Sequence, residues 1–249
     1  MNIYSVNILV GIVVAAFSYL CGGIPTGVII SKVFFHKDIR EFGSKNSGGT
    51  NAGRVLGKGV GILVIILDMI KTIIPFYLAW ALLTYVPRLN EAMHWENGYF
   101  AAPLYYWGSA LFAALGHCWS VFLRFKGGKA VSCFMGVNVL TSWIEFVCAG
   151  FTFLGVAKFS KFISLSSIIA SIVGTVTAWT IAIIAVAVPW NPHWLTWLIT
   201  IEEAPYLGFE FAIVNTLISA ILIIRHQSNI QRLRNGTESI NPFAKEQSK

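Results

Sequence analysis

The chain has 249 residues, of which 56% are apolar and only 12% are charged, and this composition excludes an ordinary soluble domain. It predicts instead a polytopic membrane protein, with room for at most about seven spans of roughly 20 residues each. The formal net charge of +7 does not indicate a nucleic-acid partner, because the basic residues lie in short segments between apolar runs, where they set topology and meet anionic headgroups.

Six apolar segments follow one another along the chain. They cover about residues 6–30, 60–85, 100–122, 130–157, 165–188 and 207–224. Inside the first of them, the sequence Cys21-Gly22-Gly23-Ile24-Pro25 is expected to kink or break the helix. A broken backbone at that depth must be buried in protein or face water.

The lysine and arginine residues between these segments predict the orientation. Residues 32–58 hold six of them, 87–99 one, 123–129 three, 158–161 two, 190–205 none and the tail from residue 225 five. Segments rich in these residues are expected in the cytoplasm. The tryptophans of residues 190–205 then fall at the outer interface, where aromatic residues anchor.

The apolar stretch 130–157 lies between two basic segments, so it should enter the membrane and return to the same side. Its 28 residues are too few for two full crossings. The sequence therefore predicts two short helices, hinged near Thr141-Ser142-Trp143. Asp68 and Lys71, three residues apart in another span, are either an ion pair that closes a helix contact or a functional relay.

The predicted fold is all-α. We expect an integral membrane protein with seven transmembrane helices, two of them short, with the N-terminus outside and the C-terminus in the cytoplasm. Residues 1–249 should form a single membrane-embedded domain, and residues 225–249 a cytoplasmic tail whose last roughly ten residues are disordered.

Three polar segments interrupt this apolar chain. The first, residues 42–54, combines glycines that allow an anion-binding nest with hydroxyl, amide and cationic side chains that suit a phosphate, or it is a flexible loop. The second, residues 116–129, places a lysine and a glycine pair at the start of a short helix, which is a phosphate seat or a positively charged turn. The third, residues 224–238, puts His226 and Asn229 on one helix face, as a site or as a membrane-exit segment.

With these motifs in order, the chain resembles the acyl-phosphate:glycerol-3-phosphate acyltransferase family (PlsY type) of bacterial phospholipid synthesis, over nearly its whole length. The family pattern G-S-x-N-x-G-x-T-N followed by arginine is met by Gly43, Ser44, Asn46, Gly48, Thr50, Asn51 and Arg54. The pattern G-H, then F-x-G-G-K-G, is similar to residues 116–117 and 125–129, and I-R-H-x-x-N-I-x-R-L-x-x-G-T-E matches residues 224–238. Five positions depart from the patterns: Gly49, Trp119, Ser120, Ala130 in place of a glycine, and Cys133.

The resemblance implies transfer of a fatty acyl group from acyl phosphate to the 1-hydroxyl of glycerol 3-phosphate, giving lysophosphatidate and inorganic phosphate. It implies a bacterial plasma-membrane enzyme whose active site faces the cytoplasm. The expected catalytic residues are Ser44, Lys129, His226 and Asn229. The expected phosphate-binding residues are Gly43, Asn46, Gly48, Gly49, Thr50, Asn51, Arg54, Gly127, Gly128, Ser164 and Ser167. His117 is expected to orient a substrate or to act as a base.

Acyl phosphate is an activated mixed anhydride, so positioning and charge neutralisation can carry the rate without a covalent intermediate, and a substrate phosphate oxygen can accept the hydroxyl proton. We expect no cofactor and no metal, because Asp38, Glu41 and Glu238 are scattered. The expected partners are the two substrates, the lipid bilayer and a soluble phosphate acyltransferase that supplies acyl phosphate. The alternative is a transporter of an anionic phosphorylated metabolite, although the halves show no similarity and residues 190–205 offer no cation to an outer path.

Overall fold

The computed structural model describes residues 3–94, 100–187 and 209–241, which are helical apart from loops and one isolated bridge between His94 and Phe100. The elements are α1 (Ile3–Gly23), α2 (Thr26–Phe35), η1 (Ile39–Glu41), α3 (Gly49–Leu56), α4 (Lys58–Tyr85), α5 (Pro87–Met93), α6 (Ala102–Cys118), η2 (Val121–Leu123), α7 (Val131–Thr141), α8 (Trp143–Ser160), α9 (Ile163–Ala187), α10 (Glu210–Arg225) and α11 (Gln227–Arg234). The all-α prediction is confirmed for these residues. The expectations for 190–205 and for 242–249 lie outside them.

Four of the described helical segments are long and apolar enough to cross a membrane: residues 5–35, α4, α8 and α9. A fifth joins them if α10 and α11, which meet at a bend of 54°, are counted as one span. The remaining apolar helices, α6 with 17 residues and α7 with 11, are shorter. The seven-span topology and the orientation of the termini therefore stay predictions.

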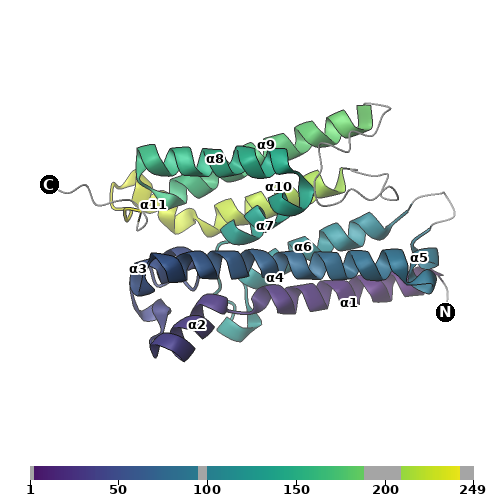
Figure 1. Ribbon diagram of the computed structural model, residues 1–249, viewed down its shortest axis with the longest axis horizontal. Coiled ribbons are helices and arrows are strands. Elements are labelled where there is room, and N and C mark those ends of the chain that lie inside the picture. The colour runs from purple at the N-terminus through teal and green to yellow at the C-terminus, as the bar shows by residue number, and fades with distance from the viewer. Residues whose placement is uncertain (1–2, 95–99, 188–208, 242–249) are drawn as a thin grey trace.

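The helices form two groups with a short helix between them. Figure 1 shows α1, α4 and α6 side by side on one side of the molecule and α8, α9 and α10 on the other, while α7 contacts both groups. Glycines allow α1 and α6 to approach closely, because a Cβ at Gly22 would lie 1.9 Å from the Ala113 carbonyl oxygen. The elements α2, α3 and α11 gather at one end of the molecule, so the ends of several spans meet there (Figure 1).

The break predicted in the first apolar segment is confirmed. The helix α1 ends at Gly23, and α2 begins after Pro25 at Thr26. The carbonyl groups freed by the break are satisfied from elsewhere, since Lys71 Nζ donates to the Ile24 oxygen at 2.9 Å and Ser120 Oγ donates to the Gly23 oxygen. The break is thus held by α4 and by the loop that follows α6.

Asp68 completes this arrangement. Its carboxylate lies 2.8 Å from Lys71 Nζ and accepts a hydrogen bond from the Thr26 hydroxyl at the start of α2. Both charged side chains are almost fully buried, with 3% and 8% of their surface exposed. The interpretation of Asp68 and Lys71 as an ion pair that closes a helix contact is confirmed.

The hinge predicted near residues 141–143 is also confirmed, because α7 ends at Thr141 and α8 begins at Trp143. Ser142 between them is extended, and its side chain caps α8 by accepting from the Ile144 N–H at 3.2 Å. The expectation of two short helices was wrong for the second, since α8 has 18 residues and runs on to Ser160. Lys158 does not stop it, because lysine is a good helix former and is favoured at a helix C-terminus.

A buried polar pair joins α8 to α10 inside the bundle. The Glu145 side chain is fully buried, and its Oε1 accepts a hydrogen bond from Asn215 Nδ2. Neither residue could be predicted from the sequence, because one acid and one amide in separate apolar runs form no motif. Their contact is a specific polar link between these two helices.

One helix was not expected at all. Residues 49–56 were predicted as part of a loop, but they form α3, which packs against α4. A Cβ at Gly49 would lie 2.7 Å from the Gly61 carbonyl oxygen, so this close contact requires glycine. The helix ends where Gly57 adopts a φ of +101°, and α4 starts at once.

Candidate functional site

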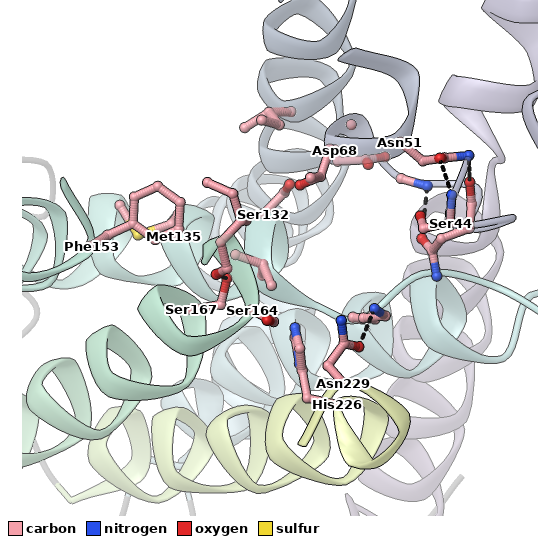
Figure 2. Close-up of a pocket in the computed structure, with 18 of the residues that line it drawn as sticks. Ser44, Asn51, Asp68, Ser132, Met135, Phe153, Ser164, Ser167, His226 and Asn229 are labelled. Carbon is pink, nitrogen blue, oxygen red and sulfur yellow. Dashed lines mark hydrogen bonds between the residues drawn. The ribbon is translucent and has the colours of Figure 1, made fainter. Parts of the chain in front are cut away.

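A cavity of about 380 Å³ opens among α3, α4, α7, α8, α9 and α11. All three polar segments reach it, as predicted. Its polar lining is Ser44, Asn46, Gly48, Gly49, Thr50, Asn51, Arg54, Asp68, His117, Lys129, Ser132, Ser164, Ser167, His226, Asn229 and Glu238. Of the predicted site residues, Gly43, Gly127 and Gly128 are missing from this lining. Figure 2 shows Ser44 and Asn51 on one side of the cavity and His226 and Asn229 on another.

Asn51 organises the first polar segment. Its Nδ2 donates to three loop carbonyl oxygens, those of Ile39, Phe42 and Asn46. Its Oδ1 accepts from the Ser44 N–H at 2.8 Å, and it would lie 2.5 Å from a Cβ at Gly43, whose φ is +59°. Both residues were expected to bind phosphate, but the Asn51 amide is already used inside the loop and Gly43 supplies a turn.

The unused donors of this segment come from three other side chains. Within the part of the chain that the structure describes, no hydrogen bond occupies the hydroxyl groups of Ser44 and Thr50 or the guanidinium of Arg54, and all three line the cavity. Burial lowers the pKa of Arg54, while the charge of Glu238 acts in the opposite direction. An arginine keeps its proton at any physiological pH, so Arg54 presents a partly desolvated cation to the cavity.

Lys129 supplies the second cation. Its Nζ donates to Asn229 Oδ1 at 2.6 Å, which ties the second polar segment to the third. Burial is the main cause that lowers the pKa of Lys129 to about 8, and the charges of Arg232 and Arg54 act in the same direction. The ammonium group is therefore partly desolvated at the cavity, and a bound anion would stabilise its charged form.

Glu238, which was not among the predicted site residues, holds Asn229 in turn. Its Oε1 accepts from Asn229 Nδ2 at 2.7 Å and from Ser164 Oγ at 3.0 Å, and its Oε2 accepts from Arg232 Nε at 2.8 Å. Burial acts to raise the pKa of Glu238, but these hydrogen bonds outweigh it and lower that pKa. Its place as the last residue of the matched third pattern was the signal that could have found it.

The glycine pair of the second polar segment has a different role from the one expected. The Gly127 N–H donates to the Cys118 oxygen at 3.1 Å and the Gly128 N–H to the His117 oxygen at 2.9 Å. Their carbonyl oxygens accept from the Arg225 guanidinium at 3.1 Å each. Because these amides are occupied and line no part of the cavity, the pair fixes the backbone that precedes Lys129.

His117 and Ala130 flank this backbone. A Cβ at Gly128 would lie 2.0 Å from His117 Nε2, so the imidazole packs directly on the glycine, and its Nδ1 lies 3.8 Å from Asp68 Oδ1. Ala130 adopts the left-handed conformation, with a φ of 60°, that a glycine at this position of the family pattern would adopt freely. The departure is thus accommodated at a cost of about 1–2 kcal/mol.

The hydrogen bond made by His226 defines the roles of its two ring nitrogens. Its Nδ1 lies 2.8 Å from the Leu222 carbonyl oxygen, which can only accept, so Nδ1 carries the proton and Nε2 of the neutral ring is an acceptor. Ser164 and Ser167 were expected to donate to phosphate. Their hydroxyls instead donate to Glu238 and to the Ile163 carbonyl oxygen, which leaves them as acceptors in this arrangement.

The rest of the cavity is apolar. Its apolar lining comes from α4, α7, α8 and α9: Ile65, Met69, Val131, Met135, Phe146, Gly150, Phe153, Leu154 and Ile163. Figure 2 shows Met135 and Phe153 together at the end of the cavity away from Ser44 and Asn229. Among the described residues, no group of three or more His, Cys, Asp or Glu side chains is placed to hold a metal ion.

Comparisons with known proteins agree with this site. The family described as "Glycerol-3-phosphate acyltransferase" matches residues 12–236. The glycerol-3-phosphate acyltransferase of Staphylococcus aureus (strain Newman) is 35% identical over 227 residues, which are 91% of this chain and 96% of that protein. Its counterpart in Staphylococcus haemolyticus (strain JCSC1435) is 36% identical over 228 residues, with the same coverage of 91% and 96%.

The fold has solved relatives as well. The crystal structure of PlsY (YgiH), an integral membrane glycerol 3-phosphate acyltransferase, in its glycerol 3-phosphate form aligns with a TM-score of 0.70 and 27% identity, over 92% of this chain and 94% of that one. Its lysophosphatidic acid form aligns with a TM-score of 0.68 and 26% identity, over the same 92% and 94%. The three polar segments that meet at the cavity, the apolar helices and these matches together show that the chain belongs to the glycerol-3-phosphate acyltransferase family of integral membrane proteins.

Proposed function

We propose that this protein transfers a fatty acyl group from acyl phosphate to the 1-hydroxyl of sn-glycerol 3-phosphate, giving lysophosphatidate and inorganic phosphate. The observation that carries the proposal is one cavity with two partly buried cationic side chains at its polar end and an apolar wall at the other. Two phosphorylated substrates, one with a long hydrocarbon tail, need this combination. The relatives are named for glycerol 3-phosphate, and the acyl phosphate donor is what the resemblance implies, supported here by the second cation and the apolar wall.

The two cations come from different elements at the polar end, Arg54 from α3 and Lys129 from the loop that precedes α7. Arg54 shares its side with the hydroxyls of Ser44 and Thr50 and with the first N–H groups of α3, which have no partner inside the helix. Lys129 shares its side with Asn229 and His226. We assign one phosphate group to each side, so that the two substrates approach each other between Arg54 and Lys129.

The transfer itself needs little from the protein beyond position and charge. The 1-hydroxyl oxygen attacks the acyl carbonyl carbon, the bond from that carbon to the bridging phosphate oxygen breaks, and the hydroxyl proton passes to a phosphate oxygen. Lys129 stabilises the negative charge that develops on the carbonyl oxygen and on the leaving phosphate. Nε2 of His226 accepts a hydrogen bond from the attacking hydroxyl and orients it.

The acyl tail enters from the lipid. Leu154 of α8 lines the cavity although 63% of its surface is exposed, so the apolar part of the cavity reaches the outside of the bundle along this helix. An acyl phosphate from the bilayer can keep its tail in this apolar part while its phosphate meets Lys129. In the proposal the polar end faces the bacterial cytoplasm, where glycerol 3-phosphate and a soluble enzyme that makes acyl phosphate are present. One membrane-embedded domain then does the whole reaction.

The test uses purified protein in lipid vesicles with palmitoyl phosphate and glycerol 3-phosphate. We expect equal amounts of lysophosphatidate and phosphate, and in Lys129→Met a loss of at least about 100-fold in kcat/KM. Lys126→Met is the matched control, because Lys126 belongs to the same loop but is exposed and lies outside the cavity lining.

One outcome would contradict the proposed reaction, and another would contradict the proposed site. One is uptake of glycerol 3-phosphate into the vesicles without any acylated product, which would favour the transporter. The other is full activity in Lys129→Met, which would leave the reaction in place and overturn the site.

A further inference from the structure

We infer that Gly150 sets the length of the acyl chain that this protein transfers, because it leaves open the part of the cavity that the end of the chain must pass. This inference rests on the proposed function, since it assigns the apolar part of the cavity to the acyl tail of the donor. Gly150 lies on α8 and lines the cavity together with Phe146 and Phe153 of the same helix.

The position of Gly150 along α8 places it far from the reacting groups. The helix ends at Ser160, close to Ser164 of the polar end, and Gly150 precedes that end by ten residues. At a rise of about 1.5 Å per residue, it lies about 15 Å from the polar end of the helix, and Phe153 about 10 Å. The carboxyl end of a bound chain therefore lies near Ser164, and its later carbons pass Phe153 before they reach Gly150.

The surroundings of Gly150 explain why a glycine matters there. A Cβ built on Gly150 would meet no atom within 4 Å, so helix packing does not require glycine at this position. Large side chains stand next to it on the same helix face, Phe153 three residues later and Phe146 four residues earlier. The missing side chain thus leaves a gap in a row of aromatic rings, and the acyl chain is the occupant that continues from the phosphate end into this gap.

The same helix provides the control. A Cβ on Gly155 would also meet no atom within 4 Å, but Gly155 does not line the cavity. The same substitution at Gly150 or at Gly155 adds the same atoms to α8. Only the side chain added at Gly150 would enter the cavity.

The experiment measures kcat/KM for a series of acyl phosphates from octanoyl to stearoyl phosphate, with Gly150→Ala, Gly150→Leu, Gly150→Phe and Gly155→Phe. As the residue at position 150 grows, we expect the longest chain transferred at the wild-type rate to become shorter. In Gly150→Phe, kcat/KM for palmitoyl phosphate should fall by at least about tenfold relative to kcat/KM for the shortest chain that the wild type accepts. The KM for glycerol 3-phosphate should stay within about twofold, since the change is remote from the polar end.

Each other result has a defined meaning. Parallel losses for all chain lengths across the Gly150 series, an unchanged preference in an active Gly150→Phe, or the same shift in Gly155→Phe would overturn the inference. A wild-type protein that transfers no acyl group from any acyl phosphate would contradict the proposed function itself, which distinguishes the two failures.

Discussion

At the scale of single residues, the site separates groups that meet the substrates from groups that hold them in place. Ser44, Thr50, Arg54 and Lys129 offer donors to the cavity, whereas Asn51 uses its amide to close its own loop. Sequence motifs contain both kinds of residue without distinguishing them, because a side chain that shapes a loop and one that binds a ligand are equally polar. Only the hydrogen bonds of the folded chain distinguish them.

Lys129 gives the clearest prediction at this scale. Burial lowers its pKa to about 8, and the protonated form is the one that neutralises phosphate, so kcat/KM should fall as the pH rises through about 8 and should be constant below. Lys129→Arg keeps its charge at every pH, so its remaining activity should show no fall in this range. The measurement is kcat/KM from pH 6.5 to pH 9.5, and a wild-type profile that stays flat to the upper limit would contradict the assignment.

At the scale of elements, the break between α1 and α2 and the hinge between α7 and α8 were predictable, because Gly-Gly-Ile-Pro and Thr-Ser-Trp carry local signals that interrupt a helix. Two features were not. The helix α3 forms from a glycine-rich stretch because its contact with α4 overrides poor helix propensity, and α8 continues past the expected end of the apolar stretch. The first depends on a contact between elements that a local pattern does not contain, and the second arises because Lys158 is compatible with a helix and does not end it.

The buried pair of Asp68 and Lys71 should determine how firmly the break is held. Lys71→Met leaves the Asp68 carboxylate without its cationic partner and the Ile24 carbonyl group without its donor, so we expect it to lower the free energy of unfolding by about 3 kcal/mol. The control is Lys58→Met, because Lys58 is an exposed lysine at the start of the same helix. This substitution should change the free energy of unfolding by less than about 0.5 kcal/mol.

Thermal and denaturant unfolding in detergent would measure the difference. The double variant Asp68→Asn with Lys71→Met should recover part of the loss, because it removes the unpaired charge. Equal stability of Lys71→Met and Lys58→Met would show that the pair does not hold the break.

At the scale of the whole molecule, the order and spacing of three polar segments in an apolar chain predicted that they would meet, and the cavity confirms this. The helical fold and the family could also be predicted, since both depend on composition and on motifs. The parts that Gly127, Gly128 and Glu238 play could not, because the two glycines turn their amides to α6 and the acid returns to Asn229 through a turn at Gly236. These roles arise only when distant segments are brought together.

The central claim is that the acyl group moves from phosphate to glycerol 3-phosphate within this one cavity. The most direct test gives the protein palmitoyl phosphate that carries ¹⁸O in the oxygen bridging carbon and phosphorus. Attack on the carbonyl carbon leaves this oxygen on phosphorus, so the account predicts one labelled phosphate for each lysophosphatidate, and Lys129→Met should lower both together. Label found in a fatty acid or in the acylated product, or phosphate released without lysophosphatidate, would contradict it.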